Sequence, residues 1–327
     1  MKVVAIGGGT GLSTVLRGLK HHVAEPARPA QFRPEITRLT AIVTVTDEGG
    51  SSGRLRRDFR ILPPGDIRNC LVALAEDEQL LTQLFNYRFS SGHGLRGHSL
   101  GNLFLAALTH LTHDFAKAVR LSSEVLAIRG EIFPATLADV HLEATRVDGV
   151  KIHGERSITK TRMPIDRLHI VPSRCRPLAE VLEAIRHADL ITLGPGSLYT
   201  SLVPNLLVQG ISREIAGSRA VKVLVGNLMT QPGESRGYSA ADHVRALNQH
   251  TRYKLFDHMV LNTKPLSPAL LKRYAAEHAA PVALDLDAVR RLGVKPVCAN
   301  LLIEDQVARH DSRRLAQILL SLARRGT

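Results

Sequence analysis

Short apolar runs that end in glycine or polar residues recur along the chain and predict buried strands. Each has about the length of a strand and is rich in Val, Ile and Leu, which is typical of parallel strands covered on both faces. The runs are KVVAIGGG (2–9), LTAIVTVTDEGG (39–50), DLITLGPGS (189–197), VKVLVGNLMTQPG (221–233) and DHMVLNTKP (257–265).

Between these runs, apolar residues recur with the spacing of an amphipathic helix. The pattern predicts helices over residues 67–84, 100–119, 178–187, 240–248 and 312–324. Strands that alternate with helices predict an α/β fold with a doubly wound, mostly parallel sheet.

One region breaks this rhythm. Residues 125–170 alternate between apolar and polar positions, and they contain Val147-Asp148-Gly149-Val150, a hairpin signal. We therefore expect a small antiparallel β-rich insertion at 125–170 within one domain that spans residues 1–327. Residues 26–34 predict a proline-containing loop between the first helix and the second strand.

The composition limits the classes of protein that remain. Apolar residues make up 44% of the 327 residues and charged residues 22%, values that are ordinary for a globular protein. The three cysteines, Cys70, Cys175 and Cys298, are far apart, so neither a disulfide framework nor a zinc site is indicated. The first residues are too briefly apolar for a signal peptide, and LGNLFLAALTHL is too short to span a bilayer. We expect a cytoplasmic protein without membrane insertion.

The charge balance points to anionic ligands. The formal net charge is +13 and the pI is near 10.1, which favours phosphates or nucleic acid as partners. The arginines are spread along the chain, aromatic residues make up only 4%, and Trp is absent. Stacking platforms for bases are therefore scarce, which argues against nucleic acid.

The first chemical motif is GGGTGLSTVLRGL (7–19), which follows the first strand and opens a helix. Gly8, Gly9, Thr10 and Gly11 would let the backbone approach a ligand and leave helix N–H groups free for an anion. Leu12 replaces the third glycine of the dinucleotide fingerprint, and no GK[ST] of a Walker A loop occurs. The alternative is a tight turn that needs only glycine.

The second motif is TVTDEGGSSGRLRRD (44–58). Asp47 and the following Glu48 would suit a metal ion or a sugar hydroxyl. The glycines and Ser51 and Ser52 could form a nest of N–H groups, and Arg54 could add charge-assisted bonds to phosphate. A flexible polar loop is the alternative.

Two predicted helix starts carry further candidates. In ILPPGDIRNCL (61–71), Asp66 suits an N-cap, and Asn69 lies in the first turn, facing either ligand or solvent. In LRGHSLGNLFL (95–105), Ser99 suits an N-cap, and Asn102 needs a polar partner if it is buried.

Later strand ends supply the remaining candidates. Gly194, Gly196 and Ser197 follow a strand and predict a second phosphate-type loop. Asn227 and Thr230 follow the next strand, in the place where ligands of α/β sheets bind. The spacing of His110 and His113 would suit a metal, but no third ligand is evident, so we expect a solvent-facing pair.

Together these motifs resemble the bacterial gluconeogenesis factor family, a relative of the 2-phospho-L-lactate transferases of coenzyme F420 synthesis. The resemblance rests on GGGTGLS, DEGGSSGRLR, PPGDIRNCLVAL, GHSLGNL, LGPGSLYTSLVPNLLV and NLMTQPGE, which occur in this order. It implies a Rossmann-like fold, a cytoplasmic location and binding of UDP-sugars, notably UDP-N-acetylglucosamine. It also implies a regulatory role in gluconeogenic growth, cell shape and wall synthesis.

The resemblance also implies residue roles. Gly8, Thr10, Gly11, Ser197 and Asn227 would surround the nucleotide. Two later residues, Tyr274 and Arg309, match positions implicated in nucleotide-sugar binding. The family usually has two aspartates where this chain has Asp47-Glu48, and Glu keeps the charge but lengthens the side chain.

Two functional readings follow. The first is a nucleotide-sugar-binding regulatory protein, which explains the two glycine loops and the lack of a catalytic triad. The second is a transferase of the 2-phospho-L-lactate type that uses Mg²⁺ near Asp47, the one catalytic candidate. A nicotinamide dehydrogenase is disfavoured because the fingerprint fails. Protein partners in cell-wall synthesis and a homo-oligomer stay open, and no further cofactor is indicated.

Overall fold

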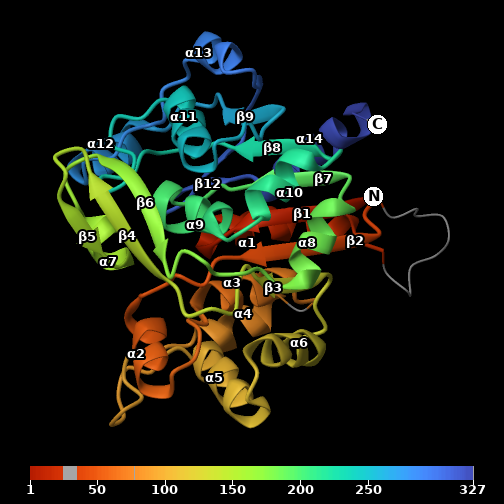
Figure 1. Cartoon of the computed structure of the whole chain (residues 1–327), viewed down its shortest axis with the longest axis vertical. Helices are drawn as coiled ribbons and strands as arrows, with labels where there is room; N and C mark the ends of the chain where they lie inside the picture. Colours follow the sequence, from red (N-terminus) through yellow and green to blue (C-terminus); the bar gives the residue numbers. More distant parts are fainter. Residues whose placement is uncertain (25–34, 77, 327) are drawn as a thin grey trace.

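A computed structural model describes residues 1–24, 35–76 and 78–326, and the proline-containing loop expected at 26–34 falls outside them. Its centre is a seven-stranded parallel sheet in the order β10-β9-β8-β7-β1-β2-β3 (Figure 1). The strands are β1 (Lys2–Gly7), β2 (Arg38–Val43), β3 (Glu131–Pro134), β7 (Leu190–Leu193), β8 (Val221–Val225), β9 (His258–Asn262) and β10 (Lys295–Ala299). The five predicted strands and the α/β class are confirmed.

The strand order places a topological switch point between β1 and β7. The chain runs outward from β1 through β2 to β3, and then returns to the other side of β1 to begin β7. In open α/β sheets, ligands bind at such a point, outside the carboxyl ends of the strands. The two predicted glycine loops follow these same two strands, so the topology alone brings them side by side.

Helices cover the sheet. Helix α1 packs against α3 and α14. Helices α8 and α10 pack against each other. The helices are α1 (Gly9–Leu19), α2 (Gly50–Phe59), α3 (Gly65–Leu74), α4 (Glu78–Asn86), α5 (Leu100–Thr112), α6 (Phe115–Val125), α7 (Glu155–Lys160), α8 (Ala179–Arg186), α9 (Val203–Leu207), α10 (Ile211–Gly217), α11 (Ala240–Thr251), α12 (Pro268–Ala276), α13 (Leu286–Arg291) and α14 (Ser312–Gly326). None of the helices within the described residues has the length and apolarity that a membrane span requires.

Two helices predicted as continuous are each divided in two. The 67–84 prediction breaks at Ala75, which is extended and forms a bridge with Ile128. The 100–119 prediction breaks because His113 adopts a left-handed conformation and the Asp114 side chain accepts the Lys117 amide, capping α6. Periodicity did not reveal either break, because the apolar spacing continues across both.

The β-rich insertion begins later than the range 125–170 suggests. Its three-stranded antiparallel sheet has the order β5-β4-β6, from β4 (His141–Arg146), β5 (Lys151–His153) and β6 (Ile165–Val171). Residues Val147–Val150 connect the first two strands, as the hairpin signal indicated. The preceding strand β3 instead extends the main sheet. In Figure 1 the insertion and α7 lie on the side toward which β8 points, away from the chain ends.

Candidate functional site

The amino-terminal ends of α1, α2 and α3 meet beyond β1 and β2. A Cβ atom on Gly8 would lie 2.6 Å from Asp66 Oδ2, and one on Gly65 would lie 2.1 Å from Asp47 Oδ2 and 2.6 Å from Ser52 Oγ. Any side chain at either position would displace the neighbouring acid. The first N–H groups of a helix have no partner within it, so the three helix ends form a surface that attracts negative charge.

The segment after Asp47 is a helix, which corrects the expected nest or flexible loop. Helix α2 begins at Gly50 with Gly49 as its N-cap, and the Gly53 amide donates to the Gly49 carbonyl at 2.7 Å. Ser51 and Ser52 therefore offer first-turn amides of a helix. Arg54 folds back along α2, where its guanidinium donates to the carbonyls of Gly50 and Arg96 at 3.2 and 2.7 Å.

Three carboxylates lie together at this junction. Burial, and then the charges of Asp47 and Glu155, raises the pKa of Asp66 to about 8. Burial also raises the pKa of Glu155 to about 7, and the charges of Asp47, Glu234 and Glu48 act in the same direction. Asp66 lies in the first turn of α3, where Pro64 is the N-cap, so the predicted capping role is wrong. Glu155, in the insertion, carries no motif that would have revealed it.

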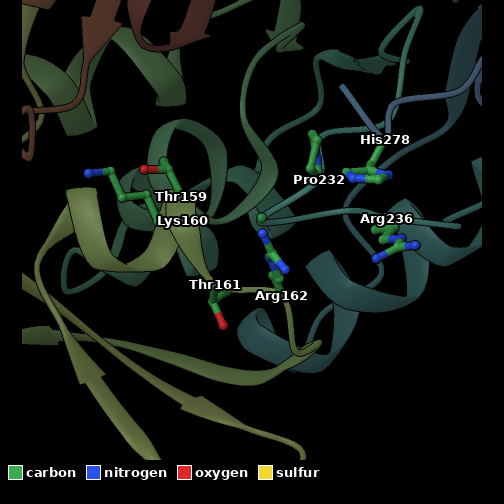
Figure 2. Close-up of a pocket in the computed structure, with 8 residues that line it drawn as sticks. Thr159, Lys160, Thr161, Arg162, Pro232, Arg236 and His278 are labelled. Carbon is green, nitrogen blue, oxygen red and sulfur yellow. The ribbon is translucent and has the colours of Figure 1, made fainter. Parts of the chain in front are cut away.

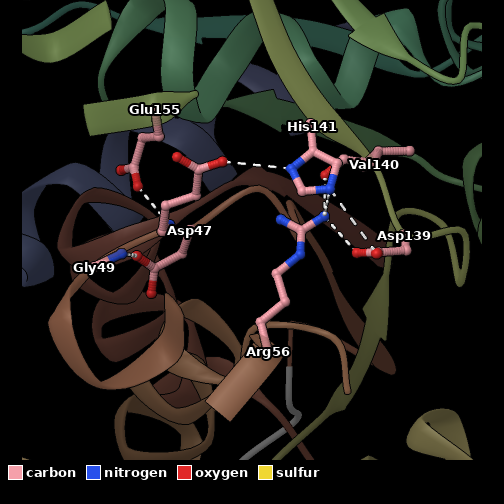
Figure 3. A network of polar contacts seen from close by, with 8 residues as sticks. Asp47, Gly49, Arg56, Asp139, Val140, His141 and Glu155 are labelled. Carbon is pink, nitrogen blue, oxygen red and sulfur yellow. Dashed lines mark hydrogen bonds and ion pairs between the residues drawn. The ribbon is translucent and has the colours of Figure 1, made fainter. Parts of the chain in front are cut away.

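Glu48 is turned away from its neighbour Asp47. Its amide donates to Glu155 Oε2 at 2.6 Å, while its carboxylate faces His141 Nδ1 at 3.5 Å (Figure 3). Asp47 Oδ1 instead accepts the Gly49 amide at 2.7 Å. The two acids of the pair therefore face different surroundings, and only Asp47 lies against Asp66.

A buried arginine fixes the insertion to α2. The Arg56 guanidinium binds the Asp139 carboxylate, donates to the Val140 carbonyl at 2.7 Å and lies 3.1 Å from His141 Nε2 (Figure 3). Its side chain is 7% exposed. This contact positions the insertion, and with it Glu155, over the acidic junction.

The second glycine loop is built differently from the first. The amides of Tyr199 and Thr200, which open the π-helical turn Leu198–Leu202, donate to the buried Glu234 carboxylate at 2.8 and 3.1 Å. The Gly194 amide donates to the Ile6 carbonyl at 3.0 Å. Most N–H groups of this loop are thus satisfied within the protein. The loop therefore forms one wall of the site and not a phosphate cradle. Glu234, which ends the motif NLMTQPGE but was not among the predicted site residues, stabilises this loop.

Asn227 joins that wall to the next strand. Its Oδ1 accepts the Gly196 amide at 3.1 Å and its Nδ2 donates to the Gly196 carbonyl at 2.8 Å. Gln231 Nε2 donates to Ser197 Oγ at 2.8 Å. On the other side, a Cβ on Gly11 would lie 2.1 Å from the Pro195 carbonyl oxygen, so the two glycine loops touch. The residues predicted at the switch point are thereby brought together, and Thr10 is exposed beside them.

Candidates on α3 and α5 form the support behind the acids. Ser99 caps α5, as predicted, and accepts from Arg68 Nη1 at 2.8 Å. Asn69 Oδ1 accepts from Arg68 Nη2 at 2.7 Å. Asn102 is buried, and its Nδ2 donates to Ser52 Oγ at 3.3 Å while its Oδ1 has no protein partner. Asn102 thus holds the α2 end that carries Ser52.

Other candidates serve the backbone or lie elsewhere. Thr230 exchanges hydrogen bonds with the Ala280 backbone at 2.7 and 3.0 Å. The rings of His110 and His113 are exposed and 6.1 Å apart, as expected for a solvent-facing pair.

The predicted late residues reach the same sheet edge through a hairpin of β11 (Leu302–Glu304) and β12 (Ala308–His310). The Ala308 amide donates to Tyr274 Oη at 3.0 Å, and His310 Nε2 contacts the Gly226 carbonyl at 3.1 Å. Burial lowers the pKa of His310 to about 4, so its neutral ring donates this bond. Arg309, between Ala308 and His310, is exposed.

The acids do not form a complete metal cage. Within the described residues, no group of three or more His, Cys, Asp or Glu side chains has an arrangement that could hold a metal ion. Asp47 and Asp66 could still supply two carboxylates to Mg²⁺, which usually takes its other ligands from water and substrate phosphates.

Comparison with known proteins identifies close relatives. A putative gluconeogenesis factor of Nostoc sp. strain PCC 7120 is 51% identical over 322 residues, which cover 98% of this chain and 68% of that protein. The gluconeogenesis factor of Bacillus subtilis strain 168 is 45% identical, with 98% of each chain covered. The crystal structure of protein BH3568 from Bacillus halodurans superposes with a TM-score of 0.91 at 46% identity, over 98% of this chain and 99% of that one.

A family model gives the same assignment. The model described as 2-phospho-L-lactate transferase CofD matches residues 3–302, which include both glycine loops and the acidic junction. Arg309 lies beyond the matched range. The chain therefore belongs to the 2-phospho-L-lactate transferase CofD family, among relatives named gluconeogenesis factors.

Proposed function

We propose that this protein binds a nucleotide sugar of the UDP-N-acetylglucosamine type and acts as a regulator. The observation that carries the proposal is the meeting of the α1 and α2 amino-terminal ends at the switch point. Their first-turn amides suit a diphosphate, and the second glycine loop closes the other side. Asp66, which lies against Gly8, has a pKa raised to about 8 by burial, so it is largely protonated at neutral pH and does not repel the diphosphate.

The regulatory role rests on the relatives. Their names associate them with gluconeogenesis. We propose that the cytoplasmic protein, with its nucleotide sugar bound, supports growth on gluconeogenic carbon sources and normal cell shape and wall synthesis. A deletion strain would grow poorly and lose shape on such carbon sources, and a binding-deficient variant would not restore it.

Ligand binding is tested by thermal unfolding with a panel of nucleotides. UDP-N-acetylglucosamine should raise the melting temperature, while NAD should not. A shift with NAD alone would contradict the proposal. Arg309→Ala should weaken UDP-N-acetylglucosamine binding and leave the fold intact, whereas Arg313→Ala, which removes the same charge from exposed α14 surface, should not.

A transferase reaction is the second candidate, favoured by the acidic junction. Asp47, Asp66 and Glu155 repel one another, and a divalent cation would relieve that repulsion. Mg²⁺ would then be held by Asp47 and Asp66 together with the phosphates of a bound nucleotide. Mg²⁺-dependent transfer of the phospho-lactyl group from a phospho-lactyl nucleotide to a deazaflavin hydroxyl, with release of the nucleoside monophosphate and loss of turnover in Asp47→Asn, would establish this activity.

A further inference from the structure

A basic pocket lies on the far side of α7 from the acidic junction. It has a volume of about 360 Å³, and its lining residues include Lys160, Arg162, Arg236 and His278 but no acid (Figure 2). Glu155 begins α7 at the acids and Lys160 ends it at the pocket. A helix of this length spans about 9 Å, so the two sites are neighbours of opposite charge.

The cationic side chains of the pocket have no acidic partner within the described part of the chain. Figure 2 shows Arg162 extending from the end of α7 into the gap, with Arg236 and His278 across from it and Lys160 directed away. Thr159 and Thr161 use their hydroxyls on the carbonyls of Arg156 and Met163. The two guanidinium groups are therefore the available donors, and their fork shape suits a phosphate or carboxylate.

The backbone holds the two walls of the pocket in close contact. A Cβ on Gly233 would lie 1.9 Å from the Thr159 carbonyl oxygen, so any side chain there would push α7 from the 232–236 segment. His278 has a φ of 60°, a left-handed conformation that few residues other than Gly, Asn and Asp adopt readily. His278 follows the end of α12 and its imidazole lines the pocket, although a glycine would adopt this backbone conformation with less strain.

We propose that this pocket binds a small phosphomonoester as a second ligand, separate from the nucleotide sugar. The volume fits a metabolite-sized molecule and is too small for a polymer. The pocket is also connected to the second glycine loop. Pro232 and Gly233 lie between Gln231, which binds Ser197, and Glu234, which binds Tyr199 and Thr200. A phosphomonoester that orders residues 231–234 would therefore also stabilise the second glycine loop, which forms the wall of the nucleotide-sugar site.

The test is a calorimetric titration of glycerol 3-phosphate into the full chain at about 0.15 M salt, with inorganic phosphate and malonate as further probes. Arg162→Ala and Arg236→Ala should each weaken glycerol 3-phosphate binding about tenfold, because each removes a charge-assisted donor. Arg156→Ala, which removes the same charge from exposed α7 surface outside the pocket, should leave it unchanged. His278→Gly, compatible with the backbone, should weaken binding without loss of stability.

Repeating the titration with saturating UDP-N-acetylglucosamine separates this site from the first. Retained glycerol 3-phosphate binding supports a second site, and competition overturns it. Equal loss in Arg156→Ala, or malonate binding as tight as glycerol 3-phosphate, also overturns the assignment. If UDP-N-acetylglucosamine fails to bind at all, the nucleotide-sugar proposal falls, while the Arg162 and Arg236 variants still decide the pocket.

Discussion

The two sides of the switch-point site are stabilised by opposite means. On the neutral side, the glycine loops touch at Gly11 and Pro195, and the Asn227 side chain bonds both the amide and the carbonyl of Gly196. On the acidic side, Asp66 and Glu155 are held together although their charges repel. The neutral side is complete without a ligand, whereas the acidic side gains stability from a proton or a cation.

This difference separates two functions within one site. A preformed neutral wall can recognise a nucleotide sugar by shape and hydrogen bonds, with little reorganisation on binding. Carboxylates with raised pKa values are the groups through which pH or Mg²⁺ would act. Variants on the acidic side should therefore leave nucleotide-sugar recognition intact, and variants on the neutral side should leave the response to pH and Mg²⁺ intact.

Gly11→Ala should have the largest effect, because the added methyl would meet the Pro195 backbone, which cannot give way easily. We expect the free energy of unfolding to fall by about 3 kcal/mol, as for strong overpacking, measured by urea denaturation. Gly217→Ala, at a position where a Cβ meets nothing within 4 Å, should be neutral. Equal stability of the two variants would show that the loops do not touch as described.

Asp66→Asn should change how stability depends on pH. The folded pKa of Asp66 is about 8 against an ordinary value of 3.8, so its stabilising contribution is complete below pH 3.8 and is lost as the pH rises to about 8. Between pH 5 and pH 8, wild type should therefore lose more unfolding free energy than Asp66→Asn, by about 3–4 kcal/mol.

Chemical denaturation in EDTA at the two pH values measures this loss. Asp305→Asn, which changes an exposed acid elsewhere, should follow wild type. If Asp66→Asn shows the wild-type pH dependence, the pKa of Asp66 is not raised in the folded protein. Added Mg²⁺ should reduce the loss in wild type if Asp47 and Asp66 hold the ion.

The sequence predicted the strands and both glycine loops because each signal is local. Val, Ile and Leu in a short run, followed by glycine, specify a buried strand and its turn without reference to the rest of the chain. The switch point then places the loops together as a consequence of strand order. The neutral side of the site was therefore largely predictable, except that the amides of the second loop are taken by Glu234.

The acidic side could not be predicted in the same way. Glu155 reaches Asp66 only because the insertion folds back over α2 and is fixed there by Arg56, a contact between distant segments. Asp66 was predicted to cap a helix because its position in the sequence suits an N-cap. Its burial among other acids depends on tertiary packing, which the local sequence does not show. A cluster of charges that forms only when distant segments of the chain fold together leaves no periodic signal in the sequence.

Asn227→Ala should weaken nucleotide-sugar binding by about tenfold, because it frees the Gly196 peptide that shapes the neutral wall. Isothermal titration with UDP-N-acetylglucosamine measures the affinity. Thr230→Ser, which keeps the hydroxyl bonded to the Ala280 amide, should bind as wild type does. Unchanged affinity in Asn227→Ala would place the ligand away from the second loop.

Glu48→Asp should have the smallest effect. The Glu48 carboxylate faces His141 across 3.5 Å, and that histidine is 54% exposed, so the pair contributes at most about 0.5 kcal/mol. Affinity for UDP-N-acetylglucosamine should not change, because the substitution keeps the backbone amide of residue 48, which donates the hydrogen bond to Glu155. A severalfold change in affinity would instead indicate that the Glu48 carboxylate contacts the ligand. The acidic side would then take part in nucleotide-sugar binding, and the two sides of the site would not be independent.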